Sequence, residues 1–71
     1  MNKEQLLIYK LMLARQEYWY GECLQYIKGI IVSDMYFAKL KPLFDEFGYQ
    51  ETINMMLEID KMENPIEVNN E

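Results

Sequence analysis

Residues 3–32 are apolar on two opposite sides when they are drawn as a single helix with about 100° between successive residues. The main stripe contains Ile8, Tyr9, Met12, Leu13, Trp19, Tyr20, Cys23, Tyr26, Ile27, Ile30 and Ile31. The second stripe contains Leu7, Leu11, Ala14 and Tyr18. A surface helix buries one apolar face against the core, so a second apolar face must be covered by a further layer of protein. The pattern therefore predicts that this helix associates with itself or with another protein.

The same spacing favours one continuous helix over residues 3–32. Asn2 can cap its start, with Gln5 three residues later as the partner in a capping box. Apolar positions continue at intervals of three and four across Gly21, and a break there would shift this spacing. One helix is therefore favoured over the alternative of two shorter helices that meet at Gly21. A helix of this length spans roughly 45 Å, whereas a compact 71-residue monomer has a diameter of roughly 30 Å. We expect the overhanging part to meet a second subunit.

Two shorter segments, at about 34–47 and 50–62, predict a helical hairpin packed on the long helix. Pro42 either kinks the first segment or follows a short turn and begins a new helix near position N1. Gly48 suits the position that ends a helix. Since no segment alternates like a strand, the predicted fold class is all-α.

The chain is short enough to form one domain, which we expect over residues 1–63. Asn64 and Pro65 end the last helix. The remaining residues are polar and acidic, so a flexible acidic tail is predicted at 64–71.

Side chains that carry most enzyme chemistry are scarce. The sequence has no histidine, one serine (Ser33), one threonine (Thr52) and one cysteine (Cys23). Metal sites built from nitrogen or sulfur ligands are therefore excluded, and its isolated glycines form no phosphate-binding loop. Paired carboxylates remain, but a solvated acidic face explains them better. We expect a non-enzymatic protein with no cofactor and no metal.

Composition also suggests where the protein works. A lone Cys23 cannot form an internal disulfide, which fits a reducing cytoplasm. No apolar run approaches the roughly 20 residues that span a bilayer. The content of Ile, Lys, Asn and Tyr hints at an A/T-rich bacterium or one of its phages or other mobile elements.

Negative charge is concentrated in the C-terminal third. Residues 45–71 hold one positive and eight negative side chains, in a chain of net charge −5. A solvated face that maintains solubility is the simplest interpretation, and docking to a basic protein surface is the next. A third is mimicry of nucleic-acid phosphates, which would inhibit a DNA- or RNA-binding enzyme. The candidate acidic surface contains Asp45, Glu46, Glu51, Glu58, Asp60 and Glu63, and mimicry would add Glu67.

One local pattern indicates a different function. The run Phe47-Gly48-Tyr49-Gln50-Glu51-Thr52-Ile53 resembles the turn and first helix of some bacterial helix-turn-helix modules. The resemblance implies DNA binding, which needs a second helix immediately afterwards to enter the major groove. An acidic tail follows instead, so direct nucleic-acid binding is not favoured.

These observations lead to one functional hypothesis. We expect a small acidic helical protein that acts as a regulator or inhibitor by binding another protein, and that forms a homodimer. The partner should carry a basic surface. The predicted protein interface contains Leu7, Leu11, Ala14, Tyr18 and Trp19. The alternative is that Leu7, Leu11, Ala14 and Tyr18 are buried against the chain's own hairpin.

Overall fold

The computed structural model describes residues 1–63, and the tail predicted at 64–71 lies outside the described residues. Every regular element in the described part is helical, which confirms the all-α prediction. In chain order the elements are α1 (Lys3–Ala14), α2 (Tyr18–Ile27), the 3-10 helix η1 (Phe37–Leu40), α3 (Lys41–Phe47) and α4 (Tyr49–Glu63).

Helix α1 begins with the predicted capping box. The Asn2 side chain accepts a hydrogen bond from the Gln5 backbone N–H at 2.8 Å, and the Gln5 side chain accepts one from the Asn2 N–H at 3.1 Å. These two bonds satisfy backbone donors that the first turn of a helix leaves without intrahelical partners. The start of α1 is thus fixed by local side-chain chemistry.

The prediction of one helix over 3–32 is wrong, because the chain turns at residues 15–17. The backbone N–H groups of Gln16 and Glu17 donate three residues back, to the carbonyls of Leu13 and Ala14, and Glu17 is extended with ψ 145°. Leu11 and Tyr20 are nine residues apart, which is about two and a half helical turns. On a continuous helix they would face opposite directions. The turn lets both enter one core, whereas Gly21, the predicted alternative break, lies inside α2.

Helix α2 also ends earlier than predicted, and residues 28–32 are not helical. Gly29 has φ +78°, a conformation that a residue without Cβ adopts readily. Its N–H donates to the Tyr26 carbonyl at 3.0 Å, and the Ile30 N–H donates to the Gln25 carbonyl at 2.8 Å. This pair of bonds is the Schellman motif, in which a glycine closes a helix.

The segment predicted as a hairpin contains η1, α3 and α4. Pro42 lies in the first turn of α3, where its missing N–H costs no intrahelical bond, so the second of the two predicted outcomes is confirmed. Gly48, with φ +98°, separates α3 from α4 as predicted. The Thr52 hydroxyl is fully buried and donates back to the Gly48 carbonyl at 2.8 Å, which secures the first turn of α4.

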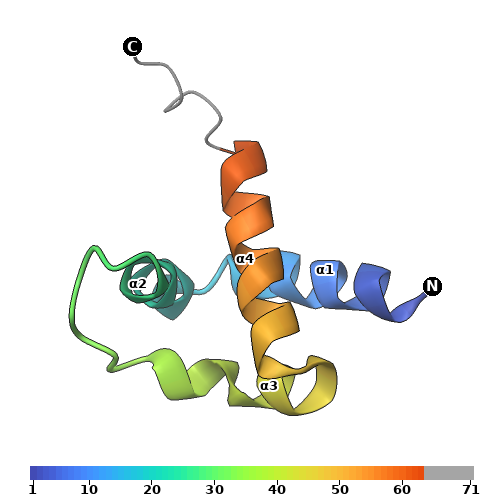
Figure 1. Ribbon diagram of the computed structural model, residues 1–71, viewed down its shortest axis with the longest axis horizontal. Coiled ribbons are helices and arrows are strands. Elements are labelled where there is room, and N and C mark those ends of the chain that lie inside the picture. The colour runs from blue at the N-terminus through green and yellow to red at the C-terminus, as the bar shows by residue number, and fades with distance from the viewer. Residues whose placement is uncertain (64–71) are drawn as a thin grey trace.

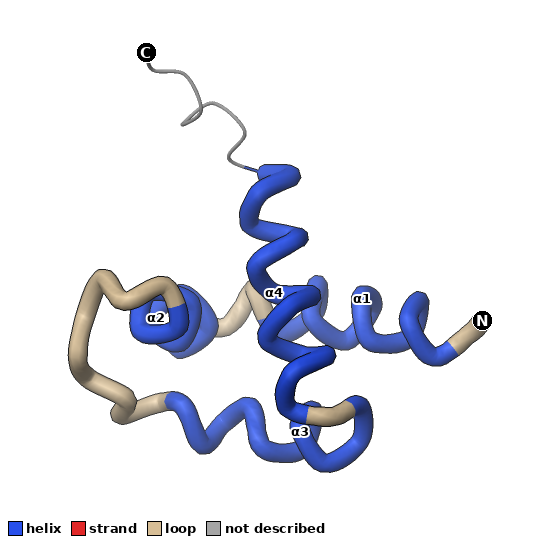
Figure 2. The backbone as a smooth tube through the Cα atoms, in the orientation of Figure 1, coloured by secondary structure: helices blue, strands red, loops and turns tan. Residues whose placement is uncertain are grey.

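Helix α4 organises the molecule by contacting α1, α2 and α3. In Figure 1 it runs across α1, while α2 is seen nearly end-on beside them. Figure 2 shows the short connection between α1 and α2 and the longer loop that leads from α2 to η1. The core between these elements contains Leu7, Leu11, Tyr20, Cys23, Leu40, Phe47, Met56 and Ile59. These residues come from all five elements, so the core joins every one of them. Burying such side chains contributes about 1.5–3 kcal/mol each.

Candidate functional site

The predicted apolar interface is divided between the core and the surface. Leu7 and Leu11 are buried in the monomer, with 3% and 0% of their surface exposed. Ala14 and Trp19 are half-buried against the same core. Tyr18 is 72% exposed, and its ring meets that of Tyr36 edge-on at 5.4 Å between centroids. The expectation that Leu7 and Leu11 form an outward face is corrected, because the turn at residues 15–17 directs them inward.

The opposite side of α1 is an exposed apolar surface. Tyr9, Met12 and Leu13 are 54%, 37% and 50% exposed. Their spacing of three and four residues places them next to one another on one helix face. We call these three side chains the outer α1 face. Sequence reasoning assigned them to the main stripe and hence to the core, because it treated α1 and α2 as one helix.

Four of the six predicted acidic residues form ion pairs within the described part of the chain. Asp45 pairs with Lys41 at 3.0 Å, Glu46 with Lys10 at 2.9 Å, and Asp60 with Lys28 at 2.7 Å. Glu63 pairs with Arg15. Three of these pairs join α4 or α3 to the N-terminal half, so they help to fix the position of those helices. Exposed pairs add at most about 1 kcal/mol each to stability.

The ion pairs change the character of the predicted acidic surface. A carboxylate next to an ammonium or guanidinium group contributes little net field at a distance. Glu51 and Glu58 are exposed and have no ion-pair partner among residues 1–63. They lie seven residues apart on α4 and thus on the same side of that helix. The structure therefore narrows the candidate negative surface to the side of α4 that carries these two glutamates.

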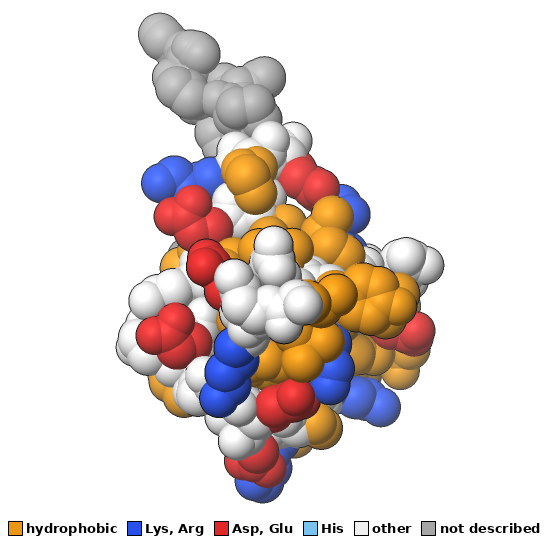
Figure 3. Space-filling model, turned by 90° about the vertical axis from the view of Figure 1, so that its right-hand side faces the viewer, with side chains coloured by type: hydrophobic (Ala, Val, Ile, Leu, Met, Phe, Trp, Pro, Cys, Tyr) orange, Lys and Arg blue, Asp and Glu red, His pale blue; other side chains and the backbone are white. Residues whose placement is uncertain are grey.

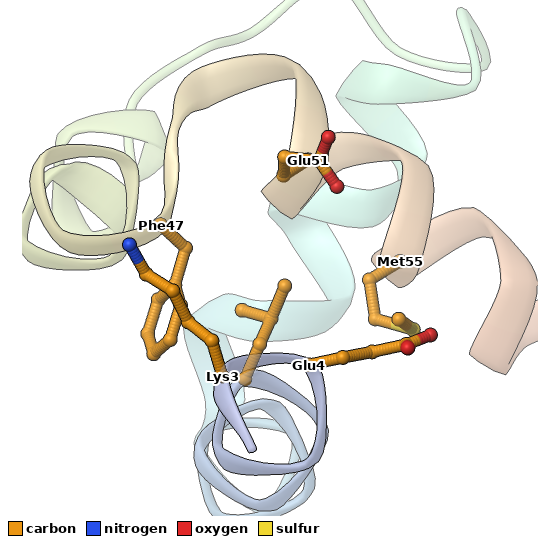
Figure 4. A pocket seen from close by; sticks show the side chains of 6 residues that line it. Lys3, Glu4, Phe47, Glu51 and Met55 are labelled. Atoms are coloured by element: carbon orange, nitrogen blue, oxygen red, sulfur yellow. The ribbon is translucent and has the colours of Figure 1, made fainter.

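An open groove lies between the amino-terminal halves of α1 and α4 and the end of α3. Its volume is about 480 Å³. Figure 4 shows Lys3 and Glu4 on α1 facing Phe47, Glu51 and Met55 across this space. Leu7 supplies the remaining wall. The groove brings together two predicted site residues, Leu7 from the apolar set and Glu51 from the acidic set. Lys3, Glu4, Phe47 and Met55 were missed, because only the tertiary fold brings these segments together.

The groove lies on the side of the molecule that carries the amino end of α1. Figure 3 views that side, where hydrophobic side chains lie around a central group of backbone and uncharged polar atoms, with lysine or arginine and acidic side chains beside them. Apolar side chains bordered by charged ones are the usual composition of a protein contact surface. The groove is thus a second candidate contact region, on the side of α1 away from the outer α1 face.

Two buried groups with ionisable side chains belong to the core. The Cys23 thiol donates to the Tyr36 carbonyl at 3.2 Å, and burial raises the pKa of this thiol, which disfavours a reactive thiolate. The Tyr20 hydroxyl is buried without a hydrogen-bond partner among the described residues. Burial is the main reason that the pKa of Tyr20 rises to about 12. Both side chains are therefore protonated at neutral pH.

Within residues 1–63, no group of three or more cysteine and acidic side chains is arranged to hold a metal ion. None of the helices in that range combines the length and apolar character needed to cross a membrane.

Comparison of the chain with protein-family models, with curated proteins and with solved structures finds no match.

Proposed function

We propose that this chain acts by binding another protein, with the outer α1 face as the contact surface. The observation that carries this proposal is the exposure of Tyr9, Met12 and Leu13 side by side on a helix whose other side is already buried in the core. Large apolar side chains grouped on one exposed helix face are typical of helix-mediated recognition. Tyrosine in particular is frequent among residues that dominate binding energy.

The partner we favour is a different protein that carries a basic surface. The chain has a net charge of −5, so two copies repel each other while a basic protein is attracted. Binding of this kind would make the protein a regulator or inhibitor that covers part of its partner. The sequence predicted a homodimer through a different set of residues, which includes Leu7 and Leu11. A homodimer through the outer α1 face is the alternative to a basic partner.

The nucleic-acid alternatives have less support. Mimicry of a phosphate backbone needs regularly spaced free carboxylates, but Asp45, Glu46 and Glu63 share their charge with nearby cations. Direct DNA binding through α4 would bring Glu51 and Glu58 towards phosphates, which they would repel.

The test is affinity capture from extracts of the source organism with three forms of the protein. These are the wild type, Tyr9→Asp, and a matched control Gln25→Asp, which adds the same charge at an exposed position of α2. We expect one basic protein to be captured by the wild type and by the control. Tyr9→Asp should reduce its affinity at least about tenfold when the purified pair is measured by calorimetry.

Light scattering on the purified protein completes the design. The proposal expects a monomeric mass for all three forms. If the wild type is a dimer and Tyr9→Asp is a monomer, the outer α1 face binds a second copy of this chain and not a basic protein. Capture of the same proteins by all three forms would overturn the role of the outer α1 face.

A further inference from the structure

The groove between α1, α3 and α4 has an apolar interior and a charged rim. Leu7, Phe47 and Met55 line its interior with hydrocarbon, an aromatic ring and a thioether. Leu7 and Phe47 are buried and Met55 is half-buried, so these walls belong to the folded core. Lys3, Glu4 and Glu51 are exposed at the edge. The volume, about 480 Å³, lies within the range of pockets that hold organic ligands. It is also ample for one long side chain of a partner.

The rim carries more negative than positive charge. Neither Glu4 nor Glu51 forms an ion pair within residues 1–63, while Lys3 is the one cation among the lining residues. Lys10 lies nearby, with its ammonium group 5.9 Å from the centre of the Phe47 ring, but it pairs with Glu46 at 2.9 Å. The two rim carboxylates are therefore available to a cation from outside.

We propose that this groove receives an arginine side chain from a basic segment of the protein partner. Arginine has an apolar stem and a charged head, so it can lie along hydrocarbon while its guanidinium group stays near water. The stem would contact Leu7 and Met55, and the planar head would reach Glu4 and Glu51, with the hydrogen-bond geometry that favours arginine over lysine. An anion is disfavoured because both glutamates would repel it.

This inference rests on the proposed function in one respect, which is that the partner is a basic protein. It uses a different surface, because Leu7 and Tyr9 are about 200° apart around α1. The groove residues and the outer α1 face can therefore be changed separately, and each can fail without the other.

The experiment is a titration of the full chain followed by the methyl NMR signals of Leu7 and Met55. The probe is a short capped peptide with an arginine between two leucines. A second peptide carries citrulline, which has nearly the same shape without the charge, and a third carries glutamate. We expect saturable shifts at both methyl positions with the arginine peptide, weaker binding with citrulline, and none with glutamate. Added salt should weaken the binding of the arginine peptide.

Variants at the rim provide the second arm. Glu4→Gln and Glu51→Gln should each weaken the arginine peptide roughly twofold to fivefold, the range expected for one exposed ion pair. Glu58→Gln is the matched control, because Glu58 is exposed on α4, has no ion-pair partner among residues 1–63, and does not line the groove. It should bind like the wild type.

The inference is overturned if the citrulline peptide binds as tightly as the arginine peptide, or if Glu58→Gln weakens binding as much as the rim variants. Absence of shifts at Leu7 and Met55 overturns it as well. Tyr9→Asp should leave the titration unchanged. If the peptide binds as expected but no partner depends on Tyr9, only the proposed function is removed. If a partner depends on Tyr9 but the peptide does not bind, only the groove inference is removed.

Discussion

Tyr20 is the core residue with a buried polar group that lacks a hydrogen-bond partner among the described residues. A buried hydroxyl in this arrangement typically costs about 1–3 kcal/mol. Burial also raises its pKa from 10.0 to about 12. Below pH 10 the tyrosine is neutral in both folded and unfolded chains. Between about pH 10 and pH 12 the unfolded chain loses its proton first, so the free energy of unfolding falls in that window.

Removal of this hydroxyl should therefore stabilise the protein. We expect Tyr20→Phe to raise the free energy of unfolding at pH 7 by about 1 kcal/mol, because no buried polar atom is left without a partner. The variant should also lose less stability than the wild type at high pH. Denaturant unfolding at pH 7 and in the alkaline window measures both effects, with Tyr9→Phe as a control at an exposed tyrosine. A Tyr20→Phe protein that is less stable than the wild type at pH 7 would contradict this description of the core.

At the scale of elements, helix ends with local chemistry were predicted correctly. Asn2 with Gln5, Pro42 near the start of α3, and Gly48 between α3 and α4 all act through residues within one turn of each other. Such capping and turn rules depend on nearby backbone groups alone. Gly29 was available as a similar sign for the end of α2, but the helix predicted over residues 3–32 passes through it.

The turn between α1 and α2 has no such local sign. Residues 15–17 are arginine, glutamine and glutamate, which all favour helix, and no glycine or proline interrupts them. Packing of Leu11 and Tyr20 into one core outweighs this propensity. The two opposite apolar stripes were the available evidence for this turn. If one core is to cover both halves of a helix whose apolar side changes midway, the chain must turn between the halves.

Proline at position 18 can test the turn directly. Tyr18 is the first residue of α2 and follows the extended Glu17, which is the backbone that proline accepts. We expect Tyr18→Pro to match Tyr18→Ala within about 1 kcal/mol in denaturant unfolding, since both lose the contact with Tyr36. In an unbroken helix, proline would be about 3 kcal/mol worse than alanine, and that result would contradict the turn.

At the scale of the whole molecule, pattern and composition predicted the fold class but not the surfaces. Lys10 and Glu46 are 36 residues apart in sequence, Lys28 and Asp60 are 32 apart, and Arg15 and Glu63 are 48 apart. The groove likewise joins residues from α1, α3 and α4. Only the relative placement of helices decides which carboxylates are paired and which side chains line a groove. Leu7 was selected from the second apolar stripe and Glu51 from the candidate acidic surface, and their meeting in one groove could not be foreseen.

The central claim is that α1 buries the side with Leu11 and exposes the side with Leu13. The most direct measurement is equilibrium unfolding, followed by circular dichroism, of Leu11→Asp and Leu13→Asp. Leu11 is fully buried, so a charge there should remove more than about 3 kcal/mol of stability or prevent folding. Leu13 is 50% exposed, and the same change should shift stability by about 0.5 kcal/mol or less. A folded Leu11→Asp protein together with an unfolded Leu13→Asp protein would contradict the account.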